Sequence, residues 1–172
     1  MINLLRKRRS IRVYEDRKIE LEKIEILKEA ILRSPSSRNI NPWEFIFVDD
    51  KELLIKLSKV KEHGSEFLES AALGIVVCGN EKKSDVWIED CSIASILVQM
   101  VAQSLGMGSC WIQIRNRMHN KEITSEEYIQ TLLGIPENMK VESIISVGYP
   151  AEEKPGIPKE ILQHKKIRIN RY

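Results

Sequence analysis

The chain has 172 residues, of which 42% are hydrophobic and 30% are charged, and its formal net charge at pH 7 is +2. This balance is typical of an ordinary folded protein and excludes a long disordered chain. The small net charge also excludes a surface that is basic all over, which general nucleic-acid binding usually requires. A chain of this length buries a sizeable core, so we expect a single domain over residues 1–172.

The first predicted elements are two helices. A short first turn leads into the basic sequence RKRRSIR at residues 6–12. The second helix covers residues 20–33, and its apolar positions fall on one face. These positions are Leu21, Ile24, Leu27 and Ile31. The sequence SPSSRNINPW at residues 34–43 ends this helix, because its Ser, Asn and Pro residues favour an ordered loop.

Strands then alternate with helices up to residue 149. The strands are predicted at residues 44–50, 73–79 (or from 71), 109–114 and 141–149. The helices are predicted at residues 51–61, 85–105 and 125–133. Gly106 is a natural end for the long helix. Ser125 is the expected N-cap of the last helix, with Glu126 and Glu127 in its positively polarised first turn. This order of elements indicates an α+β or α/β domain.

The last stretch, residues 150–172, contains three prolines and then the sequence KKIRINRY. Ile167 and Ile169 alternate with cationic residues there, which gives an extended segment one apolar and one polar side. A peripheral strand or an arm that reaches a partner suits this pattern. A frayed tail is the alternative.

The three cysteines are widely spaced and form no CxxC pair: Cys78, Cys91 and Cys110. Neither a disulfide framework nor a zinc site is therefore indicated, and we expect no bound metal. The apolar start of the chain gives way to Arg6 too early for a signal peptide. The most apolar stretch, residues 93–107, is broken by polar side chains and falls short of a membrane span. We therefore expect a protein of the reducing cytoplasm that does not enter membranes.

The usual catalytic motifs are absent. The histidines are isolated from one another: His63, His119 and His164. The sequence contains no zinc-protease, hydrolase, P-loop or complete dinucleotide-binding motif. Cys110 is either a nucleophile or, as we favour, a small filler of a buried strand. Glu89 and Asp90 are either an acid/base pair or, as we favour, part of a solvated face or of a first helical turn.

A chain without an evident catalytic side chain can take its chemistry from a bound cofactor. The sequence RRSIR supplies Arg8, Arg9, Ser10 and Arg12, which are the arginine and hydroxyl donors that a cofactor phosphate needs. The same segment also suits a solvated helix end, because cations are favourable near a helix C-terminus. The segment alone does not decide between the two.

Four motifs together carry a resemblance to a known family. They are RRSIRVY, SPSSRNINPWEF, LGMGSCWI, and ISVGYP followed by the basic tail. In this order and spacing, the sequence resembles the FMN-dependent nitroreductase family over nearly its whole length. The resemblance implies an α+β sandwich with a central, mainly antiparallel sheet flanked by helices. It also implies a homodimer with two FMN sites at its interface and C-terminal arms that embrace the partner subunit.

The resemblance further implies which residues hold the flavin. Arg8 and Ser10 are expected at the phosphate and ribityl chain, and Arg9 more loosely so. Arg12 is expected at the ring edge near N1 and O2. The backbone of Ile112 and Gln113 is expected to approach N5 and O4, and Lys166 and Arg168 of the tail are expected at the phosphate. Four loop residues are expected to line the isoalloxazine ring and the ribityl chain from the other subunit: Pro35, Ser36, Ser37 and Asn39. Asn41 stands where the family usually has glutamine.

The resemblance therefore predicts an FMN-dependent oxidoreductase. It would take a hydride from NADH or NADPH and reduce a nitroaromatic, quinone or similar small acceptor by a ping-pong route. The flavin N5 would carry the chemistry, so no catalytic side chain is needed. Two alternatives stay open: a flavin-binding redox sensor or FMN store without turnover, and a basic nucleic-acid-binding module.

Overall fold

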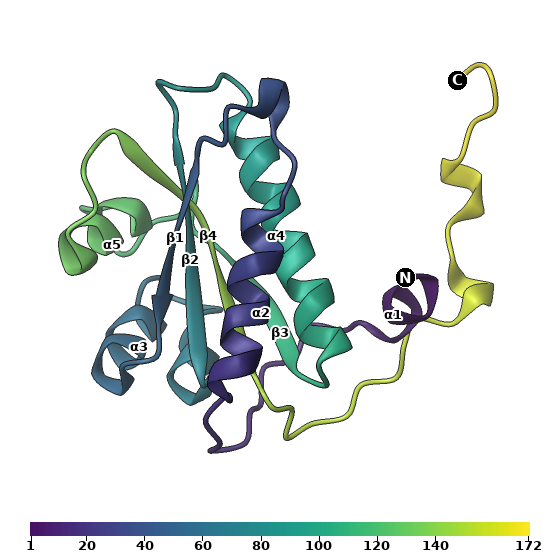
Figure 1. Cartoon of the computed structure of the whole chain (residues 1–172), viewed down its shortest axis with the longest axis horizontal. Helices are drawn as coiled ribbons and strands as arrows, with labels where there is room; N and C mark the ends of the chain where they lie inside the picture. Colours follow the sequence, from purple (N-terminus) through teal and green to yellow (C-terminus); the bar gives the residue numbers. More distant parts are fainter.

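A four-stranded antiparallel sheet lies at the centre of the computed structural model, which describes residues 1–172 (Figure 1). The strand order is β1-β2-β4-β3. The strands are β1 (Trp43–Val48), β2 (Leu73–Asn80), β3 (Gly108–Gln113) and β4 (Met139–Gly148). Every residue of β2, an inner strand, is buried. Its nearly continuous apolar run reflects this, because helices cover both faces of the sheet.

The structure contains five α-helices. They are α1 (Ile2–Lys7), α2 (Leu21–Leu32), α3 (Lys51–Ser58), α4 (Trp87–Ser104) and α5 (Ser125–Leu133). Helices α2 and α4 pack together on one face (Figure 1), where their side chains share a core with Ile145 of β4. Helices α3 and α5, with the short 3-10 helix Glu66–Ser70, share the other core with Ile144. The α+β sandwich with an antiparallel sheet is therefore confirmed.

The predicted N-cap of α5 was wrong by one residue. Thr124 caps the helix: its Oγ1 accepts the Glu127 N–H at 3.1 Å, and the Glu127 carboxylate accepts the Thr124 N–H at 2.7 Å. Ser125 is instead buried in the first turn and donates to the Val60 carbonyl at 3.0 Å. The reciprocal bonds of this capping box select Thr124, because only Thr124 has a glutamate three residues later at Glu127.

The C-terminal tail forms no strand. Residues 151–172 contain only two short 3-10 turns, Lys159–Ile161 and His164–Lys166, and they extend away from the sheet beyond α1 (Figure 1). Ile167 is 69% and Ile169 81% exposed, so their apolar sides have no partner within the chain. The predicted peripheral strand is therefore wrong for the single chain. No helix combines the length and the apolar character that crossing a membrane requires.

Candidate functional site

The basic segment after α1 lies against the open edge of β3. Ser10 forms a parallel bridge with Ser109, and the Ile11 N–H donates to the Ser109 carbonyl at 3.1 Å. Gly108 allows this approach, because a Cβ there would lie 2.7 Å from the side chain of Ile11. The sequence therefore places its basic segment along one edge of the sheet.

The backbone of β3 stays open beyond this bridge. Ser109 directs its carbonyl outward, and backbone groups alternate in direction along an antiparallel strand. Trp111 and Gln113 therefore also present their backbone groups to the edge, whereas Ile112 presents its own to β4. No other strand pairs with the edge at Gln113. Of the two predicted backbone contacts, Gln113 is thus the accessible one.

Both polar atoms of the Gln113 side chain form hydrogen bonds within the protein. Its Oε1 accepts the Trp111 indole N–H at 2.9 Å, and its Nε2 donates to the Arg115 carbonyl at 3.0 Å. Ile112 is 1% exposed and fills the core. Of these two residues, only the backbone of Gln113 is therefore free to meet a ligand.

Cationic side chains gather around Cys110 of β3. Burial raises the pKa of the Cys110 thiol, while the charges of Arg12, Lys154 and Arg8 lower it, so all three lie within electrostatic reach of the thiol. Lys154 Nζ donates to the Ser10 carbonyl at 3.1 Å. The guanidinium carbon of Arg12 lies 5.6 Å from the ring centre of Phe67. The thiol is 2% exposed and its pKa is raised, so a filler of the strand describes it better than a nucleophile.

Lys61 is a further member of this group that the sequence reasoning missed. It is half-buried between α3 and the Glu66–Ser70 turn, within electrostatic reach of Cys110. Burial lowers its pKa, and the nearby charge of Arg117 lowers it further. We call Arg8, Arg12, Lys61 and Lys154 the edge cation cluster. No local sequence pattern predicts a role for Lys61, because only the turn of the chain after α3 brings it near the other cations.

The loop of residues 34–42 packs on the start of α4. The Ser37 N–H donates to Asp90 Oδ1 at 2.9 Å, and Arg38 pairs with Asp85 at 2.5 Å. Ser36 Oγ donates to Asn41 Oδ1 at 2.7 Å and accepts the Asn41 N–H at 2.9 Å. The predicted ordered loop is confirmed, and Asn41 has a role within it.

Asp90 lies under this loop and is 2% exposed. Its Oδ2 is buried and has no hydrogen-bond partner, whereas the neighbouring Glu89 is exposed. Both residues lie in the first turn of α4, which confirms that expectation, whereas the alternative of a solvated face holds for Glu89 and not for Asp90. Adjacent helical residues diverge, so Glu89 and Asp90 form no acid/base pair.

The predicted flavin residues form three separate groups. Arg8, Ser10, Arg12 and Gln113 lie together at the edge of β3. The loop residues lie on α4: Pro35, Ser36, Ser37 and Asn39. The tail residues Lys166 and Arg168 are exposed. The tail segment extends beyond α1 (Figure 1). Arg9 is used within the chain, where its guanidinium donates to the Pro155 carbonyl at the start of the tail.

Comparison with known proteins identifies the family. Residues 5–64 and 58–149 match the Nitroreductase family. The chain belongs to this family. An FMN-dependent nitroreductase from Clostridium difficile R20291 is similar over 100% of both chains, with 47% identity and a TM-score of 0.98. A protein of Archaeoglobus fulgidus with the provisional name NADH dehydrogenase/NAD(P)H nitroreductase is 41% identical over 157 residues, 89% of this chain and 87% of its own. The family resemblance of the sequence is thus confirmed.

Proposed function

We propose that the chain is an FMN-dependent oxidoreductase that takes a hydride from NADH or NADPH and reduces a small acceptor, such as a nitroaromatic or a quinone, by a ping-pong route. The observation that carries this proposal is the edge cation cluster beside the open backbone of Gln113. The similarity to an FMN-dependent nitroreductase over the whole chain supports it.

The residues at the edge of β3 fit a flavin phosphate. The side chains of Arg8, Arg12 and Lys61 form no ion pair with an acidic residue of the chain. Arg8 and Lys61 are half-buried and Arg12 is exposed, whereas Lys154 is paired with Glu152 at 2.7 Å. Cations without acidic partners favour an anionic ligand, and a phosphate accepts charge-assisted hydrogen bonds from arginine. Ser10 adds a hydroxyl beside them. The donor set therefore suits the phosphate and the ribityl hydroxyls of FMN.

FMN, when bound, supplies the two-electron chemistry that no side chain of this protein offers. Arg8 and Ser10 would bind its phosphate end. Arg12 would place a positive charge beside the pyrimidine edge of the ring, where negative charge accumulates on reduction. The backbone of Gln113 would orient the ring through its free hydrogen-bonding groups at the strand edge.

We further propose that two copies of the chain complete each site. The loop of Ser36 and Ser37 lies on α4, and the tail cations lie beyond α1, so a second copy would supply both to the edge of β3. Helix α4 exposes Ile93 and Ile96, and the tail exposes Ile167 and Ile169. These apolar side chains support a homodimer whose C-terminal arms embrace the partner.

The visible absorption spectrum tests the function. The purified protein is mixed with FMN, passed through a gel-filtration column and then titrated anaerobically with NADH or NADPH. We expect flavin bands that stay with the protein, bleach with the nicotinamide and return with a nitroaromatic or quinone. Bands that bleach but do not return with any acceptor would favour an FMN store or sensor. A colourless protein whose affinity for DNA falls steeply with salt would favour the nucleic-acid module.

A chain that ends at Leu162 tests the arms. It lacks Lys166 and Arg168 as well as the exposed Ile167 and Ile169. We expect it to lose FMN affinity and dimer stability together, measured by flavin titration and analytical ultracentrifugation. A tight, flavin-loaded dimer of the shortened chain would show that the tail is no embracing arm.

A further inference from the structure

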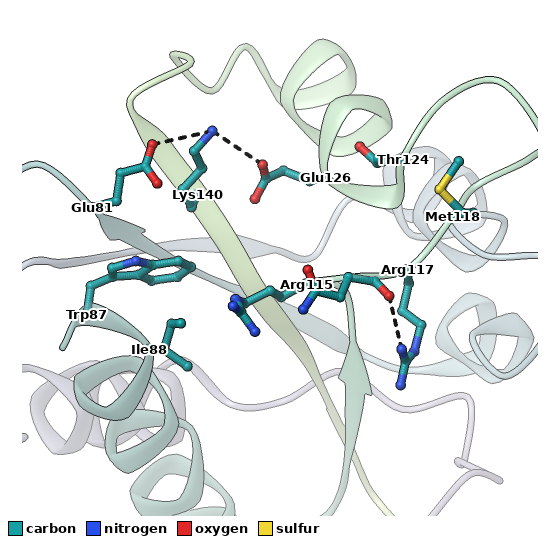
Figure 2. A pocket seen from close by; sticks show the side chains of 10 residues that line it. Glu81, Trp87, Ile88, Arg115, Arg117, Met118, Thr124, Glu126 and Lys140 are labelled. Atoms are coloured by element: carbon teal, nitrogen blue, oxygen red, sulfur yellow. Dashed lines mark hydrogen bonds and ion pairs between the residues drawn. The ribbon is translucent and has the colours of Figure 1, made fainter. Parts of the chain in front are cut away.

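A pocket of about 450 Å³ opens next to the predicted flavin edge. It lies where β2 and β3 end and α4, α5 and β4 begin (Figure 2). Arg115, which lines it, follows Gln113 by two residues, so their Cα atoms are at most about 7 Å apart. A ligand in this pocket would therefore lie close to a ring held at the backbone of Gln113.

The two sides of the pocket differ in charge. On one side, Lys140 Nζ lies 3.6 Å from a carboxylate oxygen of Glu81 and 3.6 Å from one of Glu126. Figure 2 shows the lysine between these two carboxylates. Two carboxylates face one ammonium, so this side carries excess negative charge. This side has no free cation to offer a ligand.

The other side carries Arg115 and Arg117. Neither guanidinium forms an ion pair with an acidic residue, and Arg117 donates only to the Asn116 carbonyl at 3.0 Å. Lys61 lies within electrostatic reach of Arg117 and adds a third positive charge. This arginine side is therefore the part of the pocket that lacks a compensating anion.

One buried acid lies behind the arginines. Glu142 is 4% exposed, and its Oε2 has no hydrogen-bond partner. Burial raises the pKa of Glu142, the Arg115 charge lowers it, and the exposed Glu89 of α4 raises it. A single buried acid with a raised pKa cannot balance the two arginines, and Lys61 lies within reach of the Glu66 charge. The arginine side therefore keeps excess positive charge.

Aromatic and aliphatic groups complete the lining. Trp87 is 8% exposed, and its indole lies along one wall of the pocket beside Ile88 (Figure 2). Met118 adds a thioether on the arginine side. A pocket of this size accommodates a small ring system, and its apolar groups would contact the ring while the arginines contact an acidic substituent.

We propose that this pocket binds the acidic substituent of the electron acceptor, so that the preferred acceptors are planar aromatic compounds with a carboxylate or sulfonate group. This inference rests on the proposed function, because it places the acceptor beside a flavin at Gln113. Arg115 and Arg117 would bind the anion by charge-assisted hydrogen bonds, which arginine forms in bidentate geometry.

The test compares two acceptors of nearly equal shape, 4-nitrobenzoate and 4-nitrobenzamide. The FMN-loaded protein is assayed with NADH, and the ratio of the two kcat/KM values is measured for wild type, Arg115→Gln and Arg117→Gln. Each substitution should lower the carboxylate preference about tenfold or more, which is the usual effect of a lost hydrogen bond to a charged group. Lys121→Gln is the matched control, because it removes the same charge from the same exposed segment outside the pocket. Its ratio should stay within about twofold of wild type.

A further experiment identifies which ligand carries the anion that the arginines bind, the acceptor or the hydride donor. The rate of anaerobic flavin reduction is measured with NADH and NADPH for the same variants. An effect on NADPH alone would assign the arginines to the 2′-phosphate of the hydride donor and overturn the acceptor assignment. Unchanged ratios in both arginine variants would overturn it as well. If Arg115→Gln unfolds because Glu142 loses its counter-charge, the double variant with Glu142→Gln takes its place.

The proposed function and this inference fail in different ways. A wild-type protein that binds no FMN, seen in the spectrum before any acceptor is added, would overturn both. A flavin-loaded, NADH-reducible protein without a preference for the carboxylate would overturn only the acceptor class.

Discussion

Replacing Asp90 by alanine should loosen the loop that is predicted to line the flavin. The Asp90 carboxylate holds the Ser37 N–H at 2.9 Å and is 2% exposed. The loop also contains three residues with left-handed backbone angles, Arg38, Asn39 and Asn41, at φ values of 53°, 54° and 51°. Such angles are unfavourable for Arg38 and less so for the asparagines, so the loop depends in part on contacts that hold it in place.

The size of the effect follows from the lost hydrogen bond. A hydrogen bond to a charged group contributes about 1.5–3 kcal/mol, and Asp90→Ala removes it entirely. If the loop stays ordered without FMN, this loss appears in the free energy of unfolding. If the loop becomes disordered, the loss appears in the affinity for FMN as about 10- to 150-fold weaker binding. The sum of the two losses should be about 1.5–3 kcal/mol in either case.

Two measurements give this sum: urea unfolding of the flavin-free protein and a fluorescence titration with FMN. Asp90→Asn should cost less than Asp90→Ala, because its side-chain oxygen still accepts from Ser37 and its amide nitrogen replaces the unpartnered Oδ2. Glu89→Ala is the control, since Glu89 is the exposed neighbour in the same helical turn. A combined loss below about 0.5 kcal/mol for Asp90→Ala would refute the anchoring role of this carboxylate.

Three more predictions concern single residues. Arg8→Ala should weaken FMN binding by about 1.5–3 kcal/mol. The control Arg33→Ala, at the exposed end of α2, should leave the FMN affinity unchanged. Equal FMN affinities of the two variants would exclude Arg8 from the site. Thr124→Ala should lower the free energy of unfolding by about 1 kcal/mol through loss of the α5 cap, with FMN affinity unchanged. Burial raises the pKa of Glu142 above its ordinary value of 4.5, so its proton stabilises the folded state at low pH. The free energy of unfolding should therefore fall as pH rises from about 4.5 through the raised pKa. Glu142→Gln should flatten that part of the pH profile, and an unchanged slope would assign the pH dependence to other groups.

Much of the fold could be predicted because its signals are local. The apolar face of residues 20–33 and the buried run that became β2 (Leu73–Asn80) each need only a short window of sequence. The N-cap at Thr124 could also have been predicted, since Thr124 followed three residues later by Glu127 is the capping-box signature. The neighbouring Ser125 was predicted instead.

The errors and omissions arose where residues distant in sequence meet. Asp90 looked solvated beside Glu89, and only the folding of the 34–42 loop over α4 buries it. Lys61 and Arg115 carry no motif, because chain reversals alone bring them to the edge of β3 and to the pocket. In the tail, a local pattern was present but its long-range partner was not. The alternation at Ile167 and Ile169 is compatible with a strand, but a strand also needs a neighbouring strand, which the single chain does not provide.

The placement of the predicted flavin residues favours linkage between cofactor binding and subunit association. The edge of β3 has the cations and the free backbone of Gln113, but the loop of Ser36 and Ser37 is held on α4 of the same chain by Asp90. In a two-fold dimer, each copy would give its loop and tail to the other, so both sites are completed by one interface. A ligand that contacts both subunits binds the dimer more tightly than the monomer, and by linkage it strengthens the dimer by the same factor. FMN affinity should therefore depend on protein concentration wherever the subunits dissociate, and substitutions that weaken the interface should weaken flavin binding without touching the flavin.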